Sequence, residues 1–97
     1  MRNSSWHGTH VAGTIAEATN NGLDAAGLAY KATVLPVRVL GYCGGTPADI
    51  VDAIIWASGG DVPGIPANQN PAEIINMSLG GAGAGSPEGQ DAITAAN

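Results

Sequence analysis

Residues 7–14 read H-G-T-H-V-A-G-T, a stretch with very little side-chain bulk. Two glycines and two threonines give it a poor intrinsic helix propensity, so a solvent-facing helix would rarely have this composition. A helix packed closely against a sheet would have it, because Gly8, Ala12 and Gly13 let the two backbones approach. The stretch therefore predicts a buried helix that packs on a sheet.

Turn and capping signals divide the rest of the chain into alternating helices and strands. Thr46, Pro47 and Asp49 supply an N-cap, a first helical residue and a first-turn carboxylate, which together predict a helix start. Residues 33–40 are almost continuously apolar, as in a buried parallel strand, although Pro36 cannot donate to a central ladder. The expected elements are a helix from Ser5 or Trp6 to about Glu17 with Ser4 or Ser5 as N-cap, a strand over residues 33–40, a helix from Pro47 that ends at residues 58–60, an exposed loop over residues 61–71, a strand over residues 74–79, and a helix that opens at residues 86–88.

This order, α-β-α-β-α, predicts an α/β fold with a doubly wound, mainly parallel sheet. Two parallel strands do not make a stable sheet alone, because both faces and both edges of a sheet must be covered. We therefore expect residues 1–97 to be a fragment of a larger domain.

The charge balance excludes several classes of partner. The 97 residues include only 3 Lys and Arg and carry a net charge of −5, so no basic surface is available for nucleic acid or an anionic membrane. The apolar runs are far shorter than a membrane span. Charged residues make up 11% of the chain, which suits an extracellular enzyme better than a disordered segment. The single cysteine, Cys43, is either a free thiol or half of a disulfide with a partner elsewhere.

Four blocks, in order along the chain, resemble the subtilisin-like serine proteases, the subtilase or peptidase S8 family. Residues 7–14 match the family's histidine motif residue for residue. The other blocks are G-L-A with V-R-V-L-G at residues 27–29 and 37–41, D-I-V-D-A-I-I-W-A at residues 49–57, and I-N-M-S-L-G-G at residues 75–81. Because the four blocks occur in the family's order over essentially the whole chain, the resemblance is specific. It implies a fold that is a fragment of the subtilisin-like sheet.

The resemblance implies that His7 is the general base of a Ser-His-Asp triad, which takes the serine proton and returns it to the leaving amine. Taken alone, His7 would be read as an ordinary capping or surface histidine. Ser78 lacks the family's G-T-S-M-A context, and Asp49, Asp52 and Asp61 lack its D-T-G context. The nucleophile and the orienting aspartate are therefore expected in segments that flank the chain, and we expect the chain alone to be inactive.

Two further segments are implied to bind substrate. One matches the family segment whose backbone pairs with an extended peptide and walls the first specificity pocket. The other matches the loop that lines the sites before the scissile bond. The residues are Ser78, Leu79 and Gly80 in the first segment and Leu40, Gly44 and Gly45 in the second. From the residues alone, the first segment can also be a buried strand end and the second an ordinary turn.

No metal or other cofactor is expected in the chemistry. His7 and His10 lie three residues apart, whereas a zinc-binding H-E-x-x-H helix spaces its histidines by four around a glutamate. We therefore interpret His10 as a packed, hydrogen-bonded structural histidine. Residues 20–23 resemble a loop that binds structural Ca²⁺ in some relatives, and such an ion is allowed in the parent enzyme. Calcium takes six to eight oxygen ligands, however, and the few carboxylates favour an ordinary loop.

The implied protein is a secreted serine endopeptidase that acts on peptide or protein substrates, with Cys43 paired to a cysteine outside the chain. Its other partners would be the missing N- and C-terminal parts of its own catalytic domain. The rival interpretation is a non-catalytic remnant that acts as a small binding or interaction domain, which requires the chain to fold alone.

Overall fold

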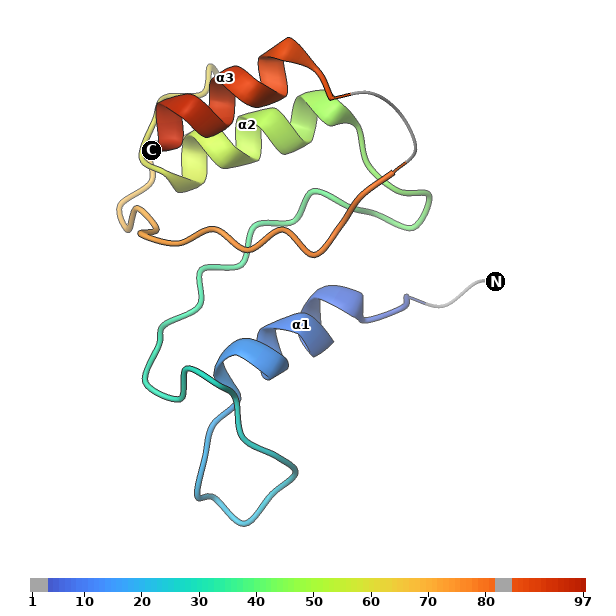
Figure 1. The fold of residues 1–97 in the computed structure, drawn as a ribbon, viewed down its shortest axis with the longest axis vertical. Coiled ribbons are helices and arrows are strands. Elements are labelled where there is room, and N and C mark those ends of the chain that lie inside the picture. Colours follow the sequence, from blue (N-terminus) through green and yellow to red (C-terminus); the bar gives the residue numbers. More distant parts are fainter. Residues whose placement is uncertain (1–3, 82–84) are drawn as a thin grey trace. The chain divides into compact units, whose positions relative to one another are not determined.

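Three α-helices form the regular structure of the computed structural model, which describes residues 4–81 and 85–97 (Figure 1). They are α1 (His7–Ala16), α2 (Pro47–Ala57) and α3 (Pro87–Ala96). The chain divides into two compact units, Met1–Val34 and Leu35–Asn97. The first unit contains α1, and the second contains α2 and α3.

The N-cap of α1 is Trp6, so the prediction of a serine cap is wrong. Trp6 has φ 56° and ψ 24°, in the left-handed region, and its side chain makes no capping hydrogen bond. A residue other than glycine pays about 1–2 kcal/mol for this conformation. Ser5 lies just outside the cap, where its Oγ accepts a long hydrogen bond of 3.4 Å from the His7 N–H.

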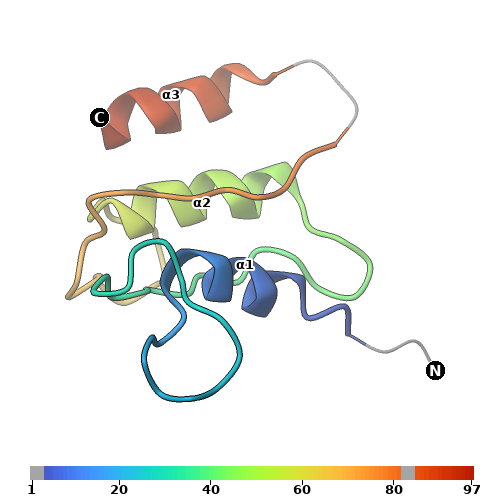
Figure 2. The same cartoon turned by 60° about the horizontal axis from the view of Figure 1, so that its bottom comes forward.

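The chain that follows α1 folds back onto the C-terminal end of this helix. The Leu28 and Ala29 N–H groups donate to the carbonyls of Thr14 and Ile15 at 3.1 and 2.7 Å, and so satisfy acceptors that lack an intrahelical partner. Gly27 is buried at this closure, and a Cβ there would collide with the backbone of the helix end. Glycine is therefore required, and the return creates the ring-shaped loop seen in Figure 2.

The predicted burial of α1 against a sheet is wrong for this part of the chain. α1 has no buried residue, and a Cβ added at Gly8 would meet nothing within 4 Å. The physical reason is that the described residues form no sheet for the small side chains of α1 to approach.

The predicted cap of α2 is confirmed, and α3 begins where predicted, with a cap of the same kind. The Thr46 Oγ accepts from the Asp49 N–H at 3.2 Å, and the Ser86 Oγ accepts from the Gly89 N–H at 3.1 Å. Each cap is followed by a proline at the first helical position, where the absent N–H costs nothing. Short-range chemistry is therefore enough to set where these helices begin.

The C-terminal end of α2 is a Schellman motif. Gly59 has φ 96°, and its N–H donates to the Trp56 carbonyl at 3.1 Å, while the Gly60 N–H donates to the Ile55 carbonyl at 2.8 Å. The loop over residues 61–71 is largely exposed, as predicted.

Side chains tie this loop to α2. The Trp56 Nε1–H donates to the Pro66 carbonyl at 2.7 Å, and the Asn68 amide donates to the Trp56 carbonyl at 3.0 Å. The Ala72 N–H then donates to the Ala57 carbonyl at 2.8 Å, so the loop returns directly to the helix end.

The two predicted strands, residues 33–40 and 74–79, are wrong as paired strands. Within the described ranges, the β-structure consists of one isolated antiparallel bridge between Gly41 and Gly44. Figure 1 nevertheless shows both segments running in the same direction, each followed by a helix that runs back. The path within the second unit is therefore that of an α/β protein, with no ladder between strands.

Side chains in residues 74–79 alternate as they do in a strand. Met77 and Leu79 line a groove against α2 and α3, whereas Ile74 is 87% exposed. Among the residues that alternate with Met77 and Leu79, the Asn76 amide donates to the Ser78 Oγ at 3.0 Å. This period of two is that of an extended β-strand. The sequence therefore encodes a strand here that has no partner strand in the described residues.

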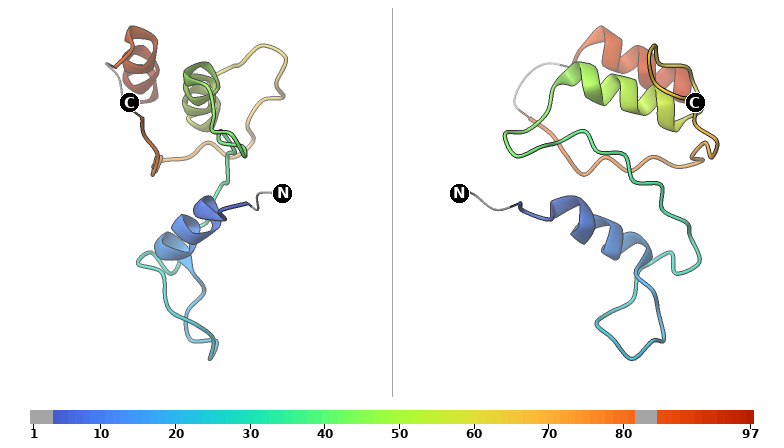
Figure 3. Two further views of the ribbon diagram at one scale, coloured as in Figure 1. Left: turned by 90° about the vertical axis from the view of Figure 1, so that its right-hand side faces the viewer. Right: turned by 180° about the vertical axis from the view of Figure 1, so that it is seen from behind.

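The core of the second unit lies at the contact between α2 and α3, which Figure 3 shows side by side from two directions. In the part of the chain that the structure describes, the buried apolar residues are Ile54, Ala57 and Ala92. Large apolar side chains elsewhere remain in water, among them Leu28 at 92% and Ile74 at 87% exposed. Burial on this scale stabilises very little against the cost of ordering the chain.

We expect the isolated 97-residue chain to unfold without a cooperative transition, because so few apolar side chains leave water. The measurement is a thermal melt followed by circular dichroism and calorimetry. A sigmoidal melt with an unfolding enthalpy near the ordinary value of about 0.7 kcal/mol per residue would contradict this expectation.

Candidate active site

His7 is the first residue of α1, and its side chain is exposed. A residue in the first helical turn lies at an open end of the helix instead of under its body. This placement suits a proton-transfer group, because a general base must reach both the group it deprotonates and the group it later protonates.

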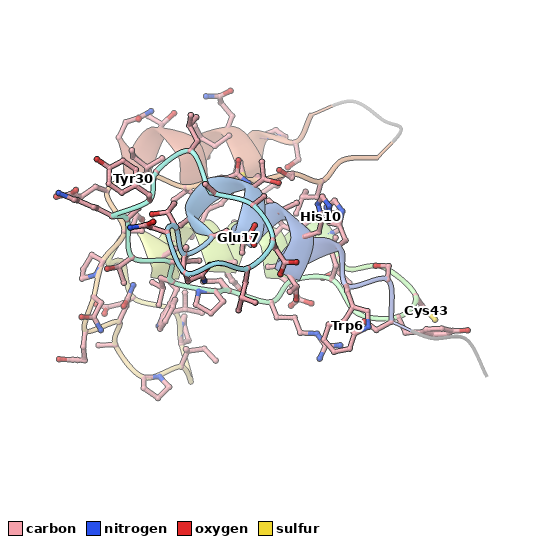
Figure 4. The ribbon with its side chains drawn as sticks, turned by 90° about the horizontal axis from the view of Figure 1, so that it is seen from below. Trp6, His10, Glu17, Tyr30 and Cys43 are labelled. Carbon is pink, nitrogen blue, oxygen red and sulfur yellow. The ribbon has the colours of Figure 1, made fainter. Side chains whose placement is uncertain are left out.

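His10 lies on the first turn of α1 in Figure 4, and it is exposed. The prediction of a packed histidine is therefore wrong, because no element of the described chain covers this face of α1. Within residues 4–81 and 85–97, no group of three or more His, Cys, Asp or Glu residues is placed to hold a metal ion. The pair His7 and His10 thus gains no third ligand there.

Leu40, Gly44 and Gly45 come together in one tight turn. The Gly41 N–H donates to the Gly44 carbonyl at 2.8 Å, and the reciprocal bond is 3.2 Å. Gly44 has φ 98°, a conformation that favours glycine. A Cβ added at Gly45 would collide with the Val39 carbonyl oxygen and lie 3.0 Å from the Leu40 side chain. The turn can therefore be this compact because positions 44 and 45 are glycine.

Ser78, Leu79 and Gly80 lie along the extended segment that follows the loop. The Leu79 side chain lines a groove of about 300 Å³ between α2 and α3, together with Ile54 and Ile93. The side chain is still 37% exposed, so the structure does not bear out the interpretation of a buried strand end. Gly80 has open space around it, since an added Cβ would meet nothing within 4 Å. Among the described residues, no side chain or backbone atom therefore occupies the space next to this Cβ position.

The predicted site residues belong to two groups. His7 lies in the unit Met1–Val34, and the six predicted substrate-binding residues lie in the unit Leu35–Asn97. Within the second unit, the turn holds three of them together through its own hydrogen bonds. Their assignment to substrate binding stays a prediction.

Side-chain hydrogen bonds close the loop at residues 20–23, and the ordinary-loop interpretation stays a prediction. The Asn21 Oδ1 accepts from the Leu23 N–H at 3.0 Å, and the Glu17 Oε1 accepts from the Ala25 N–H at 3.4 Å. These oxygens already close the loop, and Ca²⁺ needs six to eight. The loop bends through three residues with positive φ: Asn20 at 57°, Gly22 at 75° and Asp24 at 43°.

Trp6 is the feature of this region that sequence reasoning missed. It is 70% exposed, and Figure 4 shows it at the start of α1, next in the chain to His7. A signal was present, because tryptophan is a poor N-cap and directly precedes the expected base.

Cys43 is a free and exposed cysteine. None of the helices in the described residues has both the length and the apolar character to cross a membrane.

The model of the subtilase family matches residues 1–97. The chain is 68% identical over 93 residues to the extracellular protease of Xanthomonas campestris pv. campestris, which covers 96% of the chain and 16% of that protein. It is 59% identical over 90 residues to the extracellular basic protease of Dichelobacter nodosus, covering 93% of the chain and 15% of that protein.

A solved structure of a protease from Pseudoalteromonas arctica is also similar, with a TM-score of 0.94 and 67% identity. The match covers 98% of the chain and 28% of the solved chain. This likeness supports the predicted α/β subtilisin fold, of which the described residues form helices and unpaired extended segments. The chain spans about a sixth of the length of the two extracellular relatives.

Replacing Gly45 should destabilise the turn at residues 41–45. In the protein that includes the flanking segments, we expect Gly45→Ala to lower the free energy of unfolding by about 1–3 kcal/mol, because the added methyl group collides with the Val39 carbonyl. The matched control is Gly80→Ala, which meets open space and should stay within about 0.5 kcal/mol of the unchanged protein. Urea unfolding measures both, and equal losses for the two variants would contradict the account of the turn.

Proposed function

Because the chain belongs to the subtilase family, we propose that residues 1–97 are the histidine-bearing part of the catalytic domain of a secreted serine endopeptidase. The observation that carries the proposal is the family match over the whole chain, with H-G-T-H-V-A-G-T at residues 7–14. The names of the two extracellular relatives support secretion. The expected substrates are peptides or proteins.

In this proposal His7 is the general base. Its neutral imidazole takes the proton of a serine hydroxyl as the serine oxygen attacks the peptide carbonyl, and a covalent acyl-serine forms. The same imidazole gives its proton to the amine as the C–N bond breaks. Water then attacks the acyl group by the reverse sequence of proton transfers. The exposed position of His7 at the start of α1 supports this role, since both nucleophile and leaving group must reach it.

The serine and the aspartate of the triad have no counterpart with the family context among these 97 residues. We assign both to flanking segments of the same catalytic domain. The chemistry as proposed needs no metal or other cofactor, because the imidazole performs both proton transfers.

The extended segment at residues 78–80 is the proposed docking strand for the substrate backbone. Its extended path supports this role: the Leu79 side chain lines the groove against α2 and α3, and an extended segment can pair with a second extended chain through main-chain hydrogen bonds. Gly80 adds no side chain that would obstruct the approach. The turn with Leu40, Gly44 and Gly45 is proposed to line the sites before the scissile bond, where Leu40, 38% exposed, offers an apolar contact.

The alternative, a non-catalytic binding domain, needs a chain that is stable alone. The described residues bury three apolar side chains, which favours the fragment over the independent domain.

Sequencing the coding region on either side is the first experiment. An upstream D-T-G and a downstream G-T-S-M-A in frame are expected. Stop codons at both ends, with no such motifs, would contradict the proposal.

The second experiment is His7→Ala in the protein with its flanking segments. We expect kcat on a peptide substrate to fall by about 10⁶, a magnitude measured in subtilisin and carried over from it. The control is His10→Gln, which changes the other histidine of α1, one turn along, and should keep far more turnover than His7→Ala because His10 is not assigned a proton transfer. The purified 97-residue chain should show none. Turnover by that chain, lost on His7→Ala, would overturn the proposal of an inactive part.

A further inference from the structure

Trp6 has a position and a conformation that the fold does not require. It is the N-cap of α1, at φ 56° and ψ 24°, and it makes no side-chain capping bond. Serine would cap the helix better, and glycine would adopt the same backbone without strain. The indole is 70% exposed, so burial within the chain does not account for it either.

The residue that follows Trp6, His7, indicates a role for the exposed ring. Trp6 and His7 are consecutive, so their Cα atoms are about 3.8 Å apart. A general base acts within about 2.6–3.2 Å of the group it deprotonates, and that group attacks a carbonyl about 3–3.5 Å away. A residue whose Cα atom is this close to that of the base therefore lies near the substrate residues that flank the reacting bond.

We propose that Trp6 is a specificity-determining residue, which packs its exposed indole on a substrate side chain adjacent to the scissile bond and selects an apolar, above all aromatic, residue there. This rests on the proposed function of His7. Tryptophan suits such a contact, because it buries a large apolar area with only two side-chain torsions to fix and stacks favourably on other aromatic rings. The ring is 70% exposed at the helix start, and the side chain makes no capping hydrogen bond there.

The chain offers a matched control in its other tryptophan. Trp56 is half-buried, and its Nε1–H donates to the Pro66 carbonyl at 2.7 Å, which ties the loop over residues 61–71 to α2. Trp56→Phe removes this bond and tests whether loss of any tryptophan disturbs specificity. Trp6→Gly keeps the left-handed backbone without strain, so its effect is not a failure of the helix start.

The test uses the protein with its flanking segments and two peptide series, in which Phe, Ala or Arg occupies the position before or after the scissile bond. The readout is the ratio of kcat/KM for Phe over Ala, which does not depend on the fraction of active protein. We expect Trp6→Gly to lower this ratio about tenfold at one of the two positions, Trp6→Phe to restore most of it, and Trp56→Phe to leave it unchanged.

An unchanged ratio in Trp6→Gly would overturn the inference, as would an equal fall with Trp56→Phe. A preference for Arg that disappears with Trp6 would also overturn it, since the ring would then bind a cation. These outcomes differ from a failure of the proposed function, in which the starting protein cleaves no peptide of either series or retains its activity after His7→Ala.

Discussion

Contact between α2 and α3 is the packing interaction that gives the second unit its shape. Ile54 and Ala57 on α2 and Ala92 on α3 are the apolar residues buried in the described part of the chain, and the extended segment at residues 74–79 lines its groove against the same helices. Leu79 and Met77 face this groove because an extended chain alternates its side chains. Contact with α2 and α3 on one face therefore positions the proposed substrate-binding backbone at residues 78–80.

The helices of this unit were predictable from the sequence, because their boundaries depend on neighbours within a few residues. Thr46 caps α2 as expected, Ser86 caps α3, and Gly59 ends α2 through a left-handed backbone. The strands were not predictable to the same degree, because a strand is completed by a partner that is remote in sequence. Residues 74–79 have the alternation of a strand without the ladder. The small residues of α1, for the same reason, have no sheet to approach.

Most of the candidate site came from motifs that resemble the subtilase family. The whole-chain match confirms the family, and the roles of the site residues stay predictions. The structure adds two observations that the motif does not contain. Gly45 is required by the Val39 carbonyl, and His10 is exposed where packing was expected. The left-handed N-cap at Trp6 was not predicted, because the sequence pattern favoured a serine cap.

The proposed function gives these features one explanation: the chain would be part of a catalytic domain, and flanking segments would cover its apolar faces. Native-state hydrogen exchange tests this claim most directly, on the amides of α2 in the isolated chain and in the protein with its flanking segments. The account predicts nearly unprotected exchange at Ile54 and Ala57 in the isolated chain and protection greater by at least about 10³-fold in the longer protein. Equal protection of α2 in both would contradict it.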